Sequence, residues 1–327
     1  MIAITGGAGF IGSALAWRLN KLGRNDIYII DELGTGEKWK NLVGLDFNDF
    51  IDKNEFIEKW VNKLDSADIT AIIHMGANSS TTEKDADFLL KNNYRYTVSL
   101  AQAALWNNIR FIYASSAATY GDGKLGFNDN ESLIPALRPL NMYGYSKNLF
   151  DIYALKNGLL DRIVGIKYFN VYGPNEYHKG DMRSVVHKAF EQILTTGKVK
   201  LFTSKNPGYK DGEQLRDFIY IKDAVDMTLH FLLKNKKAAG IFNVGTAKAR
   251  HWNDLAKAIF KTLNKPVNIE YIELPSHLEK KYQYYTQADI TKLKNSGYKK
   301  RITSLEDGVR DYVSNYLVGE KYLDGLD

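Results

Sequence analysis

The fold is decided near the start of the chain by the stretch Ile2-Ala3-Ile4-Thr5-Gly6-Gly7-Ala8-Gly9-Phe10-Ile11-Gly12. Its first four residues are apolar or β-branched, which predicts a short buried strand. The glycines that follow permit a tight turn and a close approach of the backbone to a pyrophosphate. A helix that begins after such a turn directs its free N–H groups and the positive end of its dipole at the phosphates. The stretch therefore predicts a strand, a phosphate-binding turn and a helix.

An acidic residue supports this interpretation. Asp31 ends the next apolar run, 19 residues after Gly12, close to the spacing at which a carboxylate binds the adenosine ribose of a dinucleotide. Asp31 favours NAD, because its charge repels a 2′-phosphate. Lys38 and Lys40 follow, however, and an ammonium nearby would offset that repulsion and admit NADP. We therefore predict a bound dinucleotide, and at this point both NAD and NADP stay open.

Short apolar runs alternate with segments of helical length, the pattern of parallel strands joined by crossover helices. We predict an α/β fold, a doubly wound parallel (Rossmann) sheet with a second, smaller α/β substrate lobe. The predicted strands are 2–5, 27–31, 71–74, 110–115 and 163–169, and the predicted helices are 11–22 and 92–107. Residues 1–174 form the dinucleotide-binding domain, to which parts of about 216–250 return. Residues 175–327 form most of a discontinuous substrate-binding lobe.

Composition narrows the class of protein. The chain has 327 residues, 44% of them hydrophobic and 25% charged, as in soluble globular proteins. The absence of cysteine excludes disulfides and thiolate metal sites, the six histidines show no metal-ligand spacing, and we predict no metal. No apolar run reaches the roughly 18 residues of a membrane span, and the first strand leaves no room for a signal segment. We expect a cytoplasmic protein that does not bind membranes.

The net charge of +6 is unevenly spread, with 15 Lys or Arg against 5 Asp or Glu from residue 234 to residue 301. A solvated surface explains such a stretch, and so does a lobe that attracts a small anionic ligand. No nucleic-acid-binding motif accompanies it, and we expect no nucleic acid partner.

Three polar side chains suggest redox chemistry. Tyr143 and Lys147 are four residues apart, so on a helix they share one face. At about 5 Å the lysine charge contributes on the order of 3 kcal/mol, and we expect it to lower the pKa of Tyr143 by about two units. Ser116 ends a predicted strand at the sheet edge where such folds bind ligands. Beside a nicotinamide, this set suits alcohol oxidation or carbonyl reduction.

With these residues in view, the chain resembles the extended short-chain dehydrogenase/reductases that act on nucleotide-activated sugars. The resemblance covers essentially the whole length and rests on residues 6–12, 74–77, 115–116, Tyr143 with Lys147, 168–174, 216–218 and 242–246. Members that dehydrate sugars carry an acidic pair after the serine strand. Here Ala117, Ala118 and Thr119 follow, so the resemblance implies epimerisation, in which a sugar is oxidised and the same hydride is returned.

The segments 79–83, 92–94, 115–121, 177–180 and 285–289 resemble more narrowly the members that epimerise an ADP-activated heptose at C6 for the lipopolysaccharide core. This resemblance implies a tightly held NADP, a homo-oligomer that could be a pentamer, and Ser116, Tyr143, Lys147 and Lys179 as catalytic residues. A 4-epimerase or reductase of a UDP- or GDP-sugar would share this catalytic set. A cofactor-sensing protein without turnover is the alternative from another class.

The resemblance also assigns contacts. The cofactor-binding residues are expected to be Gly6, Gly9, Phe10, Ile11, Gly12, Asp31, Glu32, Lys38, Lys53, Met75, Gly76, Ala77, Asn78, Ser79, Asn92, Lys147, Val171 and Lys179. The substrate-binding residues are expected to be Ser79, Ser116, Asn170, Asp181, Lys188, Phe202, Thr203, Ser204, Lys205, Arg216 and Tyr282.

Overall fold

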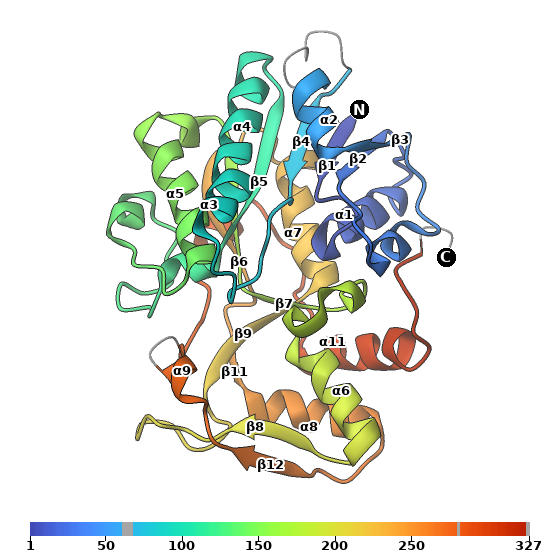
Figure 1. Cartoon of the computed structure of the whole chain (residues 1–327), viewed down its shortest axis with the longest axis vertical. Coiled ribbons are helices and arrows are strands. Elements are labelled where there is room, and N and C mark those ends of the chain that lie inside the picture. Colours follow the sequence, from blue (N-terminus) through green and yellow to red (C-terminus); the bar gives the residue numbers. More distant parts are fainter. Residues whose placement is uncertain (61–67, 280–281, 325–327) are drawn as a thin grey trace.

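Seven parallel strands form the central sheet of the protein, whose computed structural model describes residues 1–60, 68–279 and 282–324 (Figure 1). Their order is β10-β6-β5-β4-β1-β2-β3, so the chain winds outward from β1 in both directions. The strands are β1 (Ile2–Thr5), β2 (Ile27–Asp31), β3 (Asp49–Asp52), β4 (Ala71–His74), β5 (Arg110–Ser116), β6 (Val164–Tyr168) and β10 (Gly240–Val244). The predicted doubly wound Rossmann sheet is confirmed.

Helices cover both faces of this sheet, which explains why its central strands are almost wholly apolar. On one face α1 (Phe10–Asn20) packs against α7 (Ile221–Leu233). On the other lie α4 (Tyr96–Trp106) and α5 (Met142–Lys156). Helix α4 continues α3 (Ala86–Leu89) through the π-helical turn η4 (Leu90–Arg95), so the helical segment begins earlier than predicted. The short α2 (Lys53–Glu55) follows β3, and α10 (Thr291–Asn295) packs on β10.

The remaining elements form the lower part of the molecule in Figure 1. Strands β7 (Asn170–Tyr172), β9 (Leu215–Tyr220) and β11 (Ala249–His251) make a three-stranded sheet, and β8 (Val199–Phe202) pairs in parallel with β12 (Ile269–Ile272). The helices here are α6 (Val185–Thr196), α8 (Trp252–Thr262), α9 (Ser276–Glu279) and α11 (Leu305–Asp311). Helix α8 packs against both α6 and α11.

The structure corrects parts of the sequence interpretation. Strand β10 and helix α7 return to the large sheet as predicted, but β9 pairs with β7 and β11 instead. Strand β3 was not predicted, because three of its four residues are exposed or half-buried and two are aspartates. The strand order reverses between β1 and β4, and the lower part of the molecule meets the sheet at the carboxyl ends of these strands.

Candidate active site

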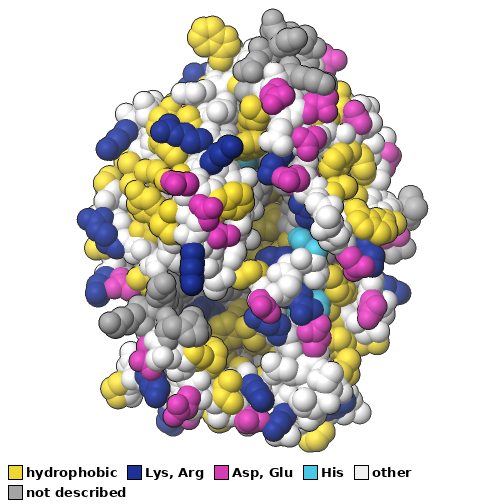
Figure 2. All heavy atoms as spheres, viewed as in Figure 1, with side chains coloured by type: hydrophobic (Ala, Val, Ile, Leu, Met, Phe, Trp, Pro, Cys, Tyr) yellow, Lys and Arg dark blue, Asp and Glu magenta, His cyan; other side chains and the backbone are white. Residues whose placement is uncertain are grey.

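A cleft of about 660 Å³ lies between the carboxyl edge of the large sheet and the lower part of the molecule. Figure 2 shows this face hollowed between the two parts, with hydrophobic side chains on the floor of the hollow. A smaller cavity of about 230 Å³ shares Gly6, Asp31, Lys38 and residues 76–78 with the cleft, and extends it past the end of β2. The two cavities form one elongated site.

The turn after β1 shapes one wall of the cleft. Gly6 has a φ of 67°, and a Cβ there would lie 2.6 Å from the backbone of Gly76. A Cβ on Gly12 would lie 2.1 Å from the carbonyl oxygen of Gly6, so the turn can close only with glycine at both positions. No side chain caps α1 and no acidic residue stands in its first turn. Its free N–H groups at the cleft fit a pyrophosphate.

Two acid–lysine pairs lie where the wall continues past β2. Lys38 Nζ donates to Asp31 at 2.7 Å, and Lys53 forms an ion pair with Glu32. The other carboxylate oxygen of Asp31 accepts from the backbone N–H of Ala8 at 2.9 Å. Each carboxylate therefore has a cationic partner, and this end of the site suits the ribose of a dinucleotide. Lys40 instead pairs with Glu37, away from Asp31.

Ser116, Tyr143 and Lys147 come together at the floor of the cleft. Strand β5 ends at Ser116, and α5 begins at Met142 with the side chain of Asn141 as its cap. The first turn of α5 therefore carries Tyr143, and the next turn carries Lys147 on the same face. Lys147 Nζ, which is buried, donates to the carbonyl oxygen of Ala114 at 2.8 Å.

The expectation that Lys147 lowers the pKa of Tyr143 is wrong in this structure. Burial raises the pKa of Tyr143 above its usual value, and the side chain of Ser116 opposes this rise only in part. Burial also lowers the pKa of Lys147 to about 8, and the negative charge of Asp151 opposes that fall. Tyr143 is therefore a neutral phenol at physiological pH, ready to donate its proton.

A buried ion pair supports this floor. Asp151, one turn after Lys147 on α5, is fully buried and accepts hydrogen bonds from Tyr113 at 2.9 Å and from Ser115 at 2.7 Å. Lys167, 1% exposed, lies 3.5 Å from its carboxylate. Because β6 pairs with β5, Lys167 stands beside Ser115. The network joins α5 to the ends of the two strands that carry the floor of the cleft.

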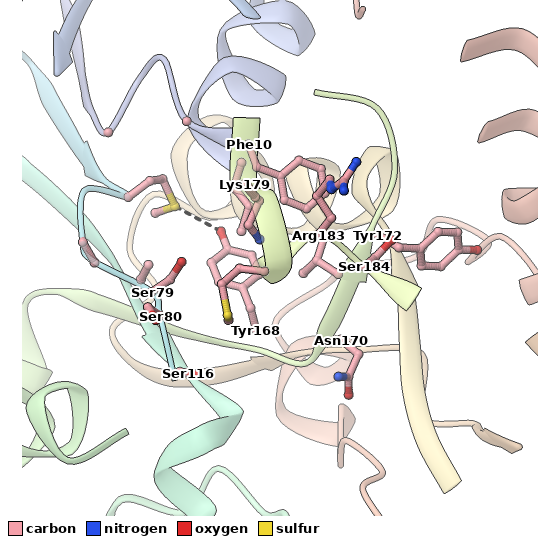
Figure 3. Close-up of a pocket in the computed structure, with 18 of the residues that line it drawn as sticks. Phe10, Ser79, Ser80, Ser116, Tyr168, Asn170, Tyr172, Lys179, Arg183 and Ser184 are labelled. Atoms are coloured by element: carbon pink, nitrogen blue, oxygen red, sulfur yellow. Dashed lines mark hydrogen bonds between the residues drawn. The ribbon is translucent and has the colours of Figure 1, made fainter. Parts of the chain in front are cut away.

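The opposite wall carries Lys179. It stands in the short 3-10 turn η8 (Tyr177–Met182), and its ammonium lies 5.1 Å from the centre of the Phe10 ring (Figure 3). Burial lowers the pKa of Lys179, and the charge of Glu176 opposes this. Ser116 and Tyr168 approach the same space from the sheet, and Tyr168 donates to the sulfur of Met75 at 3.5 Å. Proton-handling groups therefore face the cleft from two sides.

The structure brings together the residues expected to bind the cofactor. All of them line the cleft or the smaller cavity, and the four expected catalytic residues line the cleft itself. Of the residues expected to bind substrate, Ser79, Ser116 and Asn170 line the cleft. The others, which stay predictions, do not line it: Asp181, Lys188, Phe202, Thr203, Ser204, Lys205, Arg216 and Tyr282.

Several of these others gather beyond one end of the cleft. The Arg216 guanidinium lies between the rings of Trp252 and Tyr282, 5.6 Å and 5.3 Å from their centres. The Tyr282 ring also contacts Phe202. Arg216 donates to the carbonyl oxygen of Leu215 at 2.8 Å and to that of Gln283. Trp252 lines the cleft, so this aromatic and cationic cluster adjoins it. Lys188 instead donates to the carbonyl oxygen of Asp181 at 3.0 Å on an exposed surface.

Sequence reasoning missed other residues of the cleft. Ser80, Tyr168, His178, Arg183, Ser184 and Trp252 also line it. His178 lies in the same segment as Lys179. Burial and the nearby charges of Lys179 and Lys38 lower the pKa of His178 to about 4, so it is neutral at physiological pH. The position of His178 next to Lys179 in the sequence was the signal that could have placed it in the cleft.

Among residues 1–60, 68–279 and 282–324, no three or more His, Cys, Asp or Glu side chains gather as metal ligands would. Within the same ranges no helix has both the length and the apolar character that a membrane crossing requires.

Comparison with known proteins agrees with this geometry. Residues 2–245 match the model of the NAD dependent epimerase/dehydratase family. A protein of Nitratidesulfovibrio vulgaris named ADP-L-glycero-D-manno-heptose-6-epimerase is 52% identical over 317 residues, which cover 97% of this chain and 98% of that protein. A protein of Fusobacterium nucleatum with the same name is 50% identical over 329 residues, which cover 98% of this chain and 99% of that one.

A solved structure is similar over the same length. The crystal structure of Helicobacter pylori ADP-L-glycero-D-manno-heptose-6-epimerase superposes with a TM-score of 0.78 at 29% sequence identity, and the match covers 96% of this chain and 95% of that chain.

Proposed function

We propose a reaction for this chain from the premise that it belongs to the NAD dependent epimerase/dehydratase family. It interconverts ADP-D-glycero-β-D-manno-heptose and ADP-L-glycero-β-D-manno-heptose by inverting C6, a step in the synthesis of the lipopolysaccharide core. Relatives at 50–52% identity over almost the whole chain carry the name of that enzyme. The observation that carries the proposal is the convergence of Ser116, Tyr143, Lys147 and Lys179 on one cleft beside a phosphate-binding turn.

The nicotinamide cofactor supplies the chemistry that removes a hydride from C6 and later returns it to the opposite face. The residues of this chain hold the sugar oxygen and move its proton. Ser116 donates a hydrogen bond to that oxygen, and Tyr143 and Lys179 exchange its proton. The reaction needs two such groups. The C6 carbonyl turns during the reaction, so the C6 oxygen points to different sides before and after this turn. Tyr143 and Lys179 both line the cleft, one from helix α5 and the other from the turn η8, which suits this division.

The protonation states of Tyr143 and Lys179 fit one half of the reaction. The neutral phenol of Tyr143 is an acid, and burial favours the uncharged form of Lys179, which is a base. One group can therefore accept a proton while the other donates. Lys147 binds the ribose of the nicotinamide in this scheme.

NADP is the cofactor in this proposal. An unpaired carboxylate at the adenosine ribose would repel a 2′-phosphate, but Asp31 and Glu32 both have lysine partners. Lys38 and Lys53 also line the smaller cavity, where they can turn toward a phosphate. NAD would occupy the same turn through its shared pyrophosphate.

In this proposal the two lobes bind different ligands. Residues 1–174, with returns from about 216–250, hold the dinucleotide, and residues 175–327 hold most of the sugar nucleotide. Arg216 suits bidentate binding of the substrate diphosphate, for which its guanidinium turns from the two backbone carbonyls that it contacts. The enzyme works in the cytoplasm as a homo-oligomer. Light scattering tests the oligomer, and a monomer at working concentration contradicts it.

One experiment separates the candidate activities. The purified protein is incubated with ADP-D-glycero-β-D-manno-heptose, and C6 stereochemistry is followed by NMR. Appearance of the L-glycero isomer with no net change of cofactor absorbance is expected. Conversion of UDP-glucose or a GDP-sugar, but not of the ADP-heptose, would indicate a 4-epimerase or reductase. Binding of the cofactor with no conversion of any sugar would indicate a cofactor-sensing protein.

A further inference from the structure

We propose that Glu176 is a positioning residue for Lys179. Its buried carboxylate fastens the turn that carries Lys179 to the start of α6, and it supplies the negative charge that stabilises the ammonium. The inference rests on the proposed function, in which Lys179 exchanges a proton with the sugar. Glu176 itself does not line the cleft.

The carboxylate of Glu176 is completely buried and both of its oxygens are bonded. Oε2 accepts from the backbone N–H of Ser184 at 2.5 Å, and Oε1 accepts from the Ser184 hydroxyl at 2.6 Å. A buried carboxylate is tolerated only when its lone pairs are met in this way. Ser184 is the N-cap residue of α6 and lines the cleft, so Glu176 holds a fixed point of the opposite wall.

The turn between Glu176 and Ser184 is held at both ends. Lys179 donates its backbone N–H to the carbonyl oxygen of Glu176 at 3.0 Å. Gly180 then leaves the helical conformation with a φ of 52°, and Arg183 donates its backbone N–H to the carbonyl oxygen of Gly180 at 3.2 Å. A short turn that contains a left-handed glycine has little rigidity of its own. The bonds of Glu176 to Ser184 therefore limit where Lys179 can stand.

The charge of Glu176 also favours the ammonium form of Lys179. Lys179 lies against the uncharged ring of Phe10, and burial lowers its pKa, whereas Glu176 raises it. The effect is reciprocal, since Lys179 lowers the pKa of Glu176, which burial raises. Without the carboxylate, desolvation would act unopposed and the ammonium would lose its proton at a lower pH.

The other titratable groups around this pair change little near neutral pH. His178 is neutral because its pKa is about 4, and burial raises the pKa of both Tyr177 and Tyr312. Arg183 and Glu191 form an ion pair with each other at 2.6 Å, and His187 beside them has a pKa of about 4. Removal of the Glu176 carboxylate should therefore change the pKa of Lys179.

The test replaces the charge and titrates the lysine directly. Lysines are labelled by reductive methylation with ¹³C, and the Lys179 signal is identified by its loss in Lys179→Arg. In Glu176→Gln we expect the pKa of Lys179 to fall by about one unit, because a neighbouring opposite charge shifts a pKa by about 1–3 units. We also expect kcat to fall about tenfold with KM nearly constant, a part of what a general acid/base contributes. An unchanged titration would overturn the proposal.

Glu191→Gln is the matched control. It removes a carboxylate from α6, the helix that Ser184 caps, but this carboxylate pairs with Arg183, and the Lys179 titration should stay as in the wild type. A downward shift as large as that in Glu176→Gln would make the effect non-specific and refute the assignment.

Ser184→Ala keeps the charge and the backbone hydrogen bond to Oε2 but loses the hydroxyl hydrogen bond to Oε1, and it serves if Glu176→Gln does not fold. In Ser184→Ala the pKa of Lys179 should stay as in the wild type while kcat falls several-fold. Ser184→Thr should restore kcat. Turnover equal to that of the wild type in Ser184→Ala would refute the fastening. The titrations use no sugar, so a wild type that fails to convert the ADP-heptose contradicts the proposed function alone.

Discussion

The cleft places its two proton-handling groups in different ways. We call its floor, formed by β5 and α5, the first wall, and the opposite wall at η8 the second wall. Tyr143 stands in the first turn of α5, a helix of 15 residues that packs on the large sheet. Lys179 stands in a turn of six residues that contains a left-handed glycine. The first position follows from helix geometry and a nearby strand end. The second depends on contacts with α1 and α6, which are distant in the sequence or not evident from it.

The walls differ in their buried charges as well. Beneath the first wall Asp151 and Lys167 form a closed network with two hydroxyl groups. In the second wall Glu176 is bonded to Ser184, and its cationic neighbour Lys179 faces the cleft. The buried charges of Asp151 and Lys167 beneath the first wall are therefore structural, whereas the charge of Lys179 in the second wall is available for chemistry.

The sharpest test of the first wall is Tyr143→Phe. The ring should still pack, but no phenolic proton is available, so we expect turnover to fall about 10³- to 10⁴-fold while the cofactor stays bound. Turnover is measured by NMR and bound cofactor by absorbance after gel filtration. Tyr145→Phe is the control, since Tyr145 is exposed on the same helix and its removal should leave turnover unchanged. Turnover near the wild-type rate in Tyr143→Phe would exclude the phenol from proton transfer.

The scaffold role of the first wall is tested by Asp151→Asn. It leaves Lys167 buried without its counter-charge, and breaking a buried pair costs about 3–5 kcal/mol. We expect the free energy of unfolding in urea to fall by about 3 kcal/mol. Asp122→Asn is the control, because Asp122 pairs with Lys124 on the exposed surface and should change stability far less. An equal loss in the two variants would contradict the distinction.

The second wall is tested by Lys179→Met. The thioether chain can replace the stem of the lysine against Phe10 but transfers no proton, and we expect turnover to fall about 10²-fold. The surface lysine Lys198, which pairs with Glu270, gives the control Lys198→Met. Should Lys179→Met turn over normally, the lysine would belong to the surface of the turn and not to the chemistry.

The pH dependence distinguishes Lys147 from its neighbours. Its pKa is about 8, so the charged form that we assign to the cofactor is present below that pH and is lost as the pH rises through it. We expect turnover to fall about tenfold per unit above pH 8. In Lys147→Arg the guanidinium keeps its charge, and the decline should begin at higher pH, though from a lower maximum. A flat profile from pH 7 to pH 10 in the wild type would contradict this role.

The smallest effect concerns the cofactor. Removing Lys53 leaves Glu32 without its cationic partner beside the ribose site, so Lys53→Ala should weaken NADP about fivefold relative to NAD. Isothermal titration with both dinucleotides measures the ratio. The control is Lys40→Ala, which removes a lysine that pairs with Glu37 and should not alter it. An unchanged ratio in Lys53→Ala would favour NAD and weaken the NADP proposal.

Prediction from the sequence succeeded for features that depend on neighbouring residues and failed for features that depend on distant ones. The strands 2–5, 27–31 and 71–74 are observed with the predicted bounds, because a run buried on both faces has no polar alternation to obscure it. The pairing of β9 with β7 and β11 could not be foreseen, since partner choice depends on contacts across the whole fold. The pKa of Tyr143 was misjudged because burial, which raises it, is invisible in the spacing to Lys147.

The glycine turn, the parallel strands and the spacing of Tyr143 and Lys147 were determined by the sequence itself, because each acts over a few neighbouring residues through backbone geometry. The protonation of these groups, the buried carboxylate behind Lys179 and the cluster around Arg216 were decided only by the tertiary structure. Desolvation and charge depend on which distant segments exclude water from a side chain, and that is a property of the assembled fold.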